Sequence, residues 1–411
     1  MSQNNSSTAS ITGGVPYGVA DERQVRDRVR AELPRDTFRP QPWRLLWALP
    51  LLAITVGGIT AILTLEMPWW GNLLVSLLVG HAMVAQAFLS HEVLHGALGL
   101  PRWLQNLHGW IGFGPVGVTP EFWRRWHNVV HHGNTNNGDQ DPDSFGTMRR
   151  YIAQPGLIKF VRRAPGGRTL SSLLFYTYSF TLHAQLVLWI QARRRKAFQG
   201  FNRRRAIVQS LLLGAAWVSL AVVSGPLALF TVIIPLAFTN AVAQGYITTN
   251  HFLRPQAQSN NPLDNSMSLR TWRWLDPLHF RFSHHVEHHL FPKLGSNRAP
   301  RLRAWLEREM PERYVAPTHG AAIKWLYRTP KVYLTPTLLV DPASPERAFD
   351  LVALQPELQG KGKVSRDSLW VNVPARSQEP ANEGGNAREA GDRQNQRSQN
   401  VDGETAYKKA G

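Results

Sequence analysis

The stretch His284-His285-Val286-Glu287-His288-His289-Leu290-Phe291-Pro292 decides how the rest of the chain is interpreted. His285, His288 and His289 are spaced i, i+3 and i+4, and on a helix this spacing places three imidazole rings on one face. Imidazole is the commonest biological metal ligand. The stretch therefore predicts a metal site on a short helix.

Two further histidine clusters precede this stretch. His91 and His95 form an H-x3-H pair in HEVLH, and His127, His131 and His132 form an H-x3-H-H triplet in HNVVHH. Three clusters at helical spacing are not expected by accident, and eight rings exceed the four ligands of a tetrahedral zinc. The clusters predict two metal ions, while imidazole alone leaves zinc, copper, iron and nickel open.

Four apolar runs are long enough to cross a bilayer, which takes about 20 apolar residues. The connectors within the first and the second pair of runs, Glu66–Pro68 and Ser224-Gly225, contain no Lys or Arg. We therefore predict an all-α integral membrane fold with four transmembrane helices, interfacial helices and a cytoplasmic cap that carries the histidine clusters. The predicted spans are Leu45–Leu65, Trp69–Leu89, Ala206–Val223 and Pro226–Thr248.

A fifth apolar run, Thr169–Ile190, is also long enough to span, and seven basic residues follow it between Arg193 and Arg205. If this run crossed, those charges and the third cluster would lie on the opposite side from the first two clusters. Cytoplasmic loops are rich in Lys and Arg, and a shared metal centre needs all clusters on one side. We therefore expect the run to lie along the interface or to re-enter, with both termini and all clusters in the cytoplasm.

Composition restricts the other possibilities. The formal charge of +18 suits nucleic acid or an anionic membrane surface, and the spans together with the lack of a nucleic-acid-binding motif favour the membrane. The absence of cysteine excludes disulfides and iron–sulfur clusters held by this chain. We find no signal-peptide pattern, no nucleotide-binding Gly-rich loop and no fused electron-transfer module.

The polar ends set the expected domain boundaries. We expect residues 1–40 to be a disordered, charged segment with one short surface helix at Val25–Leu33. Residues 41–336 would form the membrane domain. Residues 337–411 would be a mostly disordered tail.

The three clusters HEVLH, HNVVHH and HVEHHLFP, in this order and with membrane spans between them, resemble the integral-membrane fatty acid desaturases and hydroxylases. The resemblance covers roughly residues 40–335, and the HHLFP ending is most similar to the acyl-lipid desaturase branch. His285 departs from that branch, which often has Gln at this position. The family uses nine histidines around two non-haem irons, the ninth from just after the last span, where this chain has His251.

The resemblance thus implies a set of metal ligands and no further catalytic residue. Carboxylates beside ligating histidines often accept the second ring N–H and fix its tautomer, although GDQDPDS at residues 138–144 equally suits an acidic turn. The implied ligands are His91, His95, His127, His131, His132, His251, His285, His288 and His289. The candidates for supporting them are Glu92, Asp139, Asp141, Asp143, Glu287 and, within the second span, His81.

The implied activity is desaturation of a fatty acyl lipid, with O2 as co-substrate and electrons from a separate donor, a ferredoxin or a cytochrome b5-like protein with its reductase. Hydroxylases, carotenoid ketolases and alkane oxygenases use similar clusters and remain alternatives. HEVLH also matches the H-E-x-x-H signature of zinc proteases, which leaves the other two clusters unexplained. The head group, chain length and bond position are not encoded in the spacing.

Overall fold

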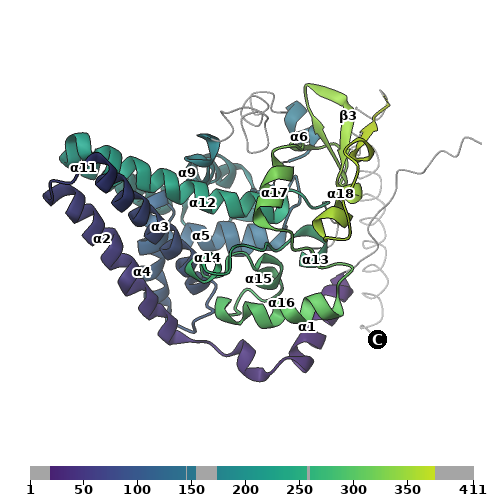
Figure 1. Ribbon diagram of the computed structural model, residues 1–411, viewed down its shortest axis with the longest axis horizontal. Helices are drawn as coiled ribbons and strands as arrows, with labels where there is room; N and C mark the ends of the chain where they lie inside the picture. Colours follow the sequence, from purple (N-terminus) through teal and green to yellow (C-terminus); the bar gives the residue numbers. More distant parts are fainter. Residues whose placement is uncertain (1–18, 145, 154–173, 257–259, 375–411) are drawn as a thin grey trace, which may run out of the picture.

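The computed structural model describes residues 19–374 except residue 145 and the segments 154–173 and 257–259. Long apolar helices occupy one side of the molecule, and short helices and turns form a cap on the other side (Figure 1). A small antiparallel sheet lies near the C-terminal end of the described chain. The predicted helical membrane fold is confirmed.

Four helical segments are long and apolar enough to cross a membrane, as predicted. Each begins and ends within a few residues of the predicted span, and the second and fourth extend past the predicted end to reach His91 and His251. These segments are η2–α2 (Pro42–Trp47 and Ala48–Thr64), α3 (Trp69–Leu94), α11–η7 (Arg203–Ser224 and Gly225–Leu227) and η8–α12 (Leu229–Ile233 and Ile234–His251).

Within the described residues, the fifth apolar run is not among the helices long and apolar enough to cross a membrane. From residue 174 it contains α9 (Ser179–Leu186) and the π-helix η5 (Val187–Gln191), while residues 169–173 lie outside the described part. One of its polar side chains, Gln185, contacts the protein and donates a hydrogen bond to the Gly117 carbonyl at 3.2 Å. The count of four spans agrees with the prediction, and the interfacial placement of this run stays a prediction.

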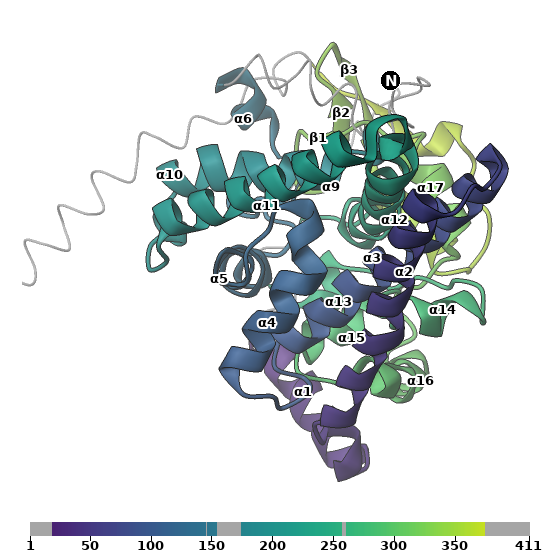
Figure 2. The ribbon, with the colours of Figure 1, turned by 90° about the vertical axis from the view of Figure 1, so that its left-hand side faces the viewer.

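Helix α3 is the central element of the helical layer and packs against α2, α4 (Arg102–Phe113) and α12 (Figure 2). The α3–α4 contact is close because α4 presents Gly112 to α3. A Cβ at Gly112 would overlap the Ser90 hydroxyl and lie 2.7 Å from the Gln86 carbonyl oxygen. This approach fixes the chain that leads into the second histidine cluster against the helix that carries the first.

Short elements complete the cap around the ends of α3 and α12. Between α4 and the fifth run they are η3 (Gly114–Val116), α5 (Pro120–Trp123), the π-helix η4 (Arg124–His131) and α6 (Met148–Ala153). Before α11 they are α10 (Ala192–Arg194) and η6 (Lys196–Phe198). After α12 they are α13 (Pro262–Asn265), α14 (Leu275–Leu278), α15 (His285–Leu290), η9 (Ser296–Arg298), α16 (Ala299–Glu309) and α17 (His319–Leu326).

The N-terminal segment is more ordered than its composition predicted. Helix α1 (Val19–Glu32) and η1 (Arg35–Phe38) are helical, and residues 1–18 lie outside the described part. The expected surface helix is in fact docked, because Val25 and Val29 are buried in a cluster with Trp305. Two apolar residues four positions apart suffice to hold an otherwise charged helix on the cap.

The predicted tail contains a small folded unit, so the prediction of a mostly disordered tail is wrong for residues 337–374. Phe349 and Leu354 are fully buried in the main core, although the apolar runs in this part of the sequence are only a few residues long. Residues 375–411 lie outside the described part. The sheet has the order β1 (Val332–Tyr333), β2 (Leu338–Asp341), β3 (Ser344–Asp350), β4 (Trp370–Asn372), all antiparallel, accompanied by α18 (Leu351–Leu358) and η10 (Asp367–Leu369).

Candidate metal centre

The nine histidines that the sequence singles out as ligands converge on one place in the cap. They are carried by the C-terminal end of α3, by η4 and the residue after it, by the last residue of α12, and by α15. Eight of them form two groups of four, with the ligand atoms of each group within 4.8 Å of one another. The groups are His91, His95, His127 and His288, and His131, His251, His285 and His289.

The ring nitrogens face one another at the separation that shared ligation requires. Nε2 of His91 lies 2.9 Å from Nε2 of His127, and Nε2 of His285 lies 2.8 Å from Nε2 of His251. Imidazole nitrogens bound about 2.1 Å from a common ion sit roughly 3 Å apart. The two groups therefore have the geometry of two adjacent metal sites.

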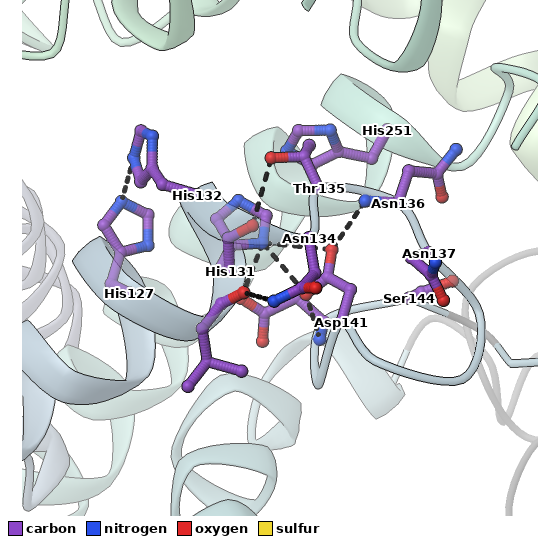
Figure 3. Close-up of polar contacts among 12 residues, drawn as sticks. His127, His131, His132, Asn134, Thr135, Asn136, Asn137, Asp141, Ser144 and His251 are labelled. Atoms are coloured by element: carbon purple, nitrogen blue, oxygen red, sulfur yellow. Dashed lines mark hydrogen bonds and ion pairs between the residues drawn. The ribbon is translucent and has the colours of Figure 1, made fainter. Parts of the chain in front are cut away.

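His132 is within reach of both groups, and Figure 3 shows its ring next to that of His127. Its Nε2 is 3.2 Å from Nε2 of His127 and 3.2 Å from Nε2 of His288. Its ring stacks on that of His289 with 4.2 Å between centroids. The step from His131 to His132 at the end of η4 thus turns one ring toward each group.

The burial of these rings fits a metal better than a hydrogen-bonded core. Nε2 of His95 is buried and has no hydrogen-bond partner among the described residues, which is costly unless a ligand completes it. The donor set of the two groups is imidazole throughout, and such a set suits iron, zinc, copper or nickel. The residues present therefore fit a pair of first-row metal ions.

Burial also keeps the rings in the form that binds metal. It lowers the pKa of His127, His132, His285 and His289 well below the usual value, and the charges of neighbouring rings lower it further. Burial, followed by the charge of His131, lowers the pKa of His288 to about 3. These rings are neutral near pH 7, and a neutral imidazole nitrogen is a metal ligand.

His131 differs because two carboxylates face it. Its Nδ1 lies 3.0 and 3.1 Å from the two oxygens of Asp141 and 3.4 Å from Asp143 (Figure 3). Burial opposes its protonation, but the charge and hydrogen bond of Asp141 and the charge of Asp143 outweigh burial and raise the pKa of His131 to about 9. Asp141 is itself fixed by the backbone N–H groups of Asn136 (2.7 Å) and Asp143 (2.9 Å).

The remaining candidates for supporting the ligands lie elsewhere. Asp139 is exposed and pairs with Arg149 and Thr147, because it sits on the outer side of the turn that points Asp141 inward. The ring of His81 lies beside that of His279, with 5.2 Å between the ring centroids, and not among the predicted ligands. The structure therefore gives neither residue a hydrogen bond to a predicted ligand.

The two glutamates adjacent to ligands point away from the centre, because neighbours on a helix are about 100° apart. Glu92 accepts hydrogen bonds from Arg44 at 2.8 Å and from the backbone N–H and hydroxyl of Ser296 at 3.0 and 2.9 Å. Glu287 accepts from Ser268, Arg303 and Tyr314. Both carboxylates tie the histidine-bearing helices to the rest of the cap.

Three hydroxyl groups near the ligands were not predicted. Ser266 Oγ lies 3.2 Å from Nδ1 of His251, and Thr135 Oγ1 lies 3.4 Å from Nδ1 of His289. Ser268 accepts the backbone N–H groups of His285 and Val286, each at 3.0 Å, and so holds the start of α15. Isolated Ser and Thr residues carry no signal in one sequence, so only the fold reveals them.

An apolar cavity of about 170 Å³ adjoins the centre. Five of the nine rings line it, and Trp123 and Trp126 form part of its wall. Both tryptophans are buried and belong to the main hydrophobic core. The ligand rings in the wall are His91, His127, His131, His251 and His285, and the apolar residues include Ala87, Phe88, Phe113, Val116, Phe180, Ala243 and Ile247.

Comparison with known proteins agrees with this arrangement. A family model described as fatty acid desaturase matches residues 68–321, which is more than half of the chain and includes the three histidine clusters. Similar curated proteins include an sn-1 oleoyl-lipid 12-desaturase of Picosynechococcus sp. (32% identical over 33% of this chain). An sn-1 linoleoyl-lipid 6-desaturase of Arthrospira platensis is 29% identical over 32% of this chain.

A third relative, of Nostoc sp., is named sn-1 acyl-lipid omega-3 desaturase (ferredoxin) and is 26% identical over 33% of this chain. The matched region spans less than half of each of these three relatives, at 39%, 36% and 36% of their lengths.

Proposed function

We propose that this chain, which belongs to the fatty acid desaturase family, is a membrane-bound acyl-lipid desaturase that inserts a double bond into a fatty acyl chain with O2 and two electrons. One observation carries the proposal. Nine buried or half-buried histidines converge next to an apolar cavity, and eight of them form two adjacent groups of four. The names of the similar curated proteins support an acyl lipid as the substrate.

The nine rings would hold two irons. His91, His95, His127 and His288 would bind one, His131, His251, His285 and His289 the other, and His132 lies within reach of both groups. Two irons held there would supply the oxidation of unactivated C–H bonds by O2, which the acid–base and nucleophilic side chains of a protein cannot perform. Asp141 would keep Nδ1 of His131 protonated and so direct its Nε2 toward the metal.

The cavity would position the acyl chain. A saturated methylene offers no charge or hydrogen bond for recognition, so its place must be set by shape and apolar contact. Phe88, Phe113 and Trp123 supply apolar surface next to the His91 ring, whose centroid lies 5.4 Å from that of Trp123. The same side chains exclude water from the reacting carbons.

We propose that the histidine clusters and both termini face the cytoplasm. The supporting observation is the set of basic residues at the start of α11 and in the segment before it, Arg193 to Arg205, which lies at the same end of α11 as the metal centre. Positive residues accumulate on the cytoplasmic side of membrane proteins. The electrons would come from a separate one-electron carrier on that side.

The zinc protease alternative is disfavoured by the position of Glu92. In an H-E-x-x-H protease the glutamate acts as general base beside the metal, whereas here both its oxygens are engaged by Arg44 and Ser296. A hydroxylase or ketolase would use the same metal centre, and the outcome at the carbon separates it from a desaturase.

Expression in a host of known lipid composition tests the proposal. The fatty acids of membrane lipids would be converted to methyl esters and analysed by mass spectrometry, with the iron content of the purified protein measured in parallel. We expect a new double bond and about two irons per chain. A hydroxylated product, or protein loaded with zinc and no change in lipids, would contradict the proposal. The variant His285→Ala serves as the inactive control.

A further inference from the structure

A second and larger cavity, of about 670 Å³, reaches the metal centre between α1 and the end of α15. Two of the nine rings, His95 and His132, line this cavity, and neither lines the apolar cavity that holds the proposed acyl site. The centre is therefore accessible from two separate cavities, each of which contacts a different set of rings.

The lining of the second cavity is basic. Arg26, Arg30, Arg35 and Lys293 contribute to it, and none of its described lining residues is acidic. Apolar contacts come from residues such as Phe38, Leu290 and Phe291. We call this cavity with its four basic residues the basic port. Four cations around an opening of this size attract a negatively charged partner.

Most of the positive charge of the basic port is not neutralised from within the chain. Arg30, Arg35 and Lys293 are exposed, and the structure records no ion pair for Arg35 or Lys293 among the described residues. Arg30 lies over the Phe291 ring at 5.5 Å, and its carboxylate partner, Asp27, is 3.9 Å away. Arg26 alone has a close carboxylate partner, Glu22. The port thus presents three exposed cations, one of which, Arg30, lies against the Phe291 ring.

The basic port lies on the far side of the molecule from the connectors between the spanning helices. The connectors between α2 and α3 and between α11 and α12 lie at the left of Figure 1, whereas α1 lies at the lower right, beyond the cap. The other basic group, Arg193 to Arg205, adjoins the first turn of the spanning helix α11 and is placed to meet lipid headgroups. Three of the four port residues, Arg26, Arg30 and Lys293, belong to α1 and to the turn after α15, outside the spanning helices, and this placement favours a soluble partner over a lipid surface.

We propose that the basic port is the docking site of the electron donor, a small acidic protein that carries one electron at a time. This inference rests on the proposed desaturase function and adds the face through which electrons enter. Two reduced carriers are oxidised in turn, and each gives up one electron. These two electrons, two protons from water and the two hydrogens removed from the acyl chain reduce O2 to two waters as the carbon–carbon double bond forms.

The geometry suits this role because the port ends directly on two ligand rings. A donor whose acidic surface is held by Arg30, Arg35 and Lys293 would place its redox group over the opening that leads to His95 and His132. Charge complementarity of this kind raises the rate of encounter and makes it depend on salt. The acyl chain, bound in the other cavity, would not compete for the same space.

The test measures binding without turnover. Full-length protein in lipid nanodiscs is titrated by calorimetry with two acidic probes, a plant-type [2Fe–2S] ferredoxin and the soluble haem domain of cytochrome b5, at low and at high salt. We expect at least one probe to bind, more weakly as salt rises. The triple variant Arg30→Gln, Arg35→Gln, Lys293→Gln should bind that probe roughly tenfold more weakly.

A matched variant controls for total charge. Arg193→Gln, Arg194→Gln and Arg204→Gln together remove the same three charges beside α11, where all three residues are exposed, and should leave probe binding unchanged. Equal iron content and equal thermal unfolding would show that both variants are folded. In steady-state assays the port variant should raise the KM for the donor while kcat at saturating donor is retained.

Three results would overturn the inference: no binding of either probe, equal weakening in both variants, or loss of binding to phosphatidylglycerol vesicles in the port variant with probe binding intact. The last would assign the face to a lipid surface. The two proposals can fail separately. If a probe binds in a salt-dependent way that requires the port residues, but the protein forms no double bond, the docking site would be supported and only the desaturase function would be contradicted.

Discussion

Both carboxylate oxygens of Asp141 lie within hydrogen-bond distance of Nδ1 of His131, at 3.0 and 3.1 Å, inside the cap. Both side chains are buried, and Asp141 is oriented by backbone N–H groups of Asn136 and Asp143. The carboxylate therefore determines which nitrogen of His131 carries the proton and which faces the centre. Asp141 lies ten residues after His131, across a tight turn, so the carboxylate that supports the second cluster comes from the same short stretch of sequence.

We predict that Asp141→Asn weakens iron binding or activity by about 10- to 100-fold, as the loss of such a partner does in other metal sites. The neutral amide is isosteric but no longer stabilises the N–H of His131 with a full charge. Iron per chain and the yield of unsaturated product report the effect. Asp139→Asn is the matched control, because Asp139 is exposed and pairs with Arg149. Equal effects of the two changes would contradict the assignment.

We predict that His91→Ala abolishes iron binding and desaturation while the protein still inserts into the membrane. His91 belongs to the first group of four and its Nε2 lies 2.9 Å from that of His127. His81→Ala, ten residues earlier on the same helix, removes a ring that belongs to neither group and should retain the iron. Metal analysis of both purified variants checks this, and full iron occupancy in His91→Ala would exclude its ligand role.

We predict that Ala243→Trp eliminates desaturation but leaves the iron in place. Ala243 is buried and lines the apolar cavity, so the larger ring would fill the space proposed for the acyl chain. Ile233→Trp, on the same spanning segment but 56% exposed, adds a tryptophan without touching the cavity and should be active. Lipid analysis and iron content distinguish the outcomes; normal product from Ala243→Trp would place the substrate elsewhere.

The sequence was sufficient to predict that the three histidine clusters each present their rings on one helix face, because that spacing is local. His285, His288 and His289 must share a helix face wherever the helix packs, and His91 with His95 and His127 with His131 follow the same i, i+4 rule. The spans were predictable for a similar reason, since bilayer thickness sets their length.

The supporting contacts were not predictable in the same way, because they depend on long-range packing. Glu92 and Asp141 were equally good candidates in the sequence. In the structure, Glu92 pairs with Arg44, 48 residues away, and points away from the metal centre. The folded unit at residues 337–374 was missed because its apolar runs, Leu338–Val340 and Leu351–Leu354, are short. The overall composition of the segment does not show which short apolar runs will pair. In the structure, β-pairing brings Leu339 opposite Phe349.

The last prediction concerns acid stability and uses His108 of α4, which is no metal ligand. Its ring is buried between α4 and α3, with Nε2 2.8 Å from the Gln86 amide nitrogen and Nδ1 2.9 Å from the Ser90 hydroxyl. Burial lowers the pKa of His108 from 6.5 to about 4. The folded state therefore binds this proton less readily than the unfolded state.

The sign of the effect follows from linkage. Stability from neutral His108 is complete above pH 6.5, falls as the unfolded state becomes protonated, and is fully lost once the pH reaches about 4, the folded-state pKa. A shift of this size corresponds to about 3 kcal/mol. We expect His108→Gln to be less stable at neutral pH but to lose less stability between pH 6.5 and 4. Thermal unfolding of metal-free protein across this range measures the difference, and parallel pH profiles for the two proteins would show that His108 does not titrate there.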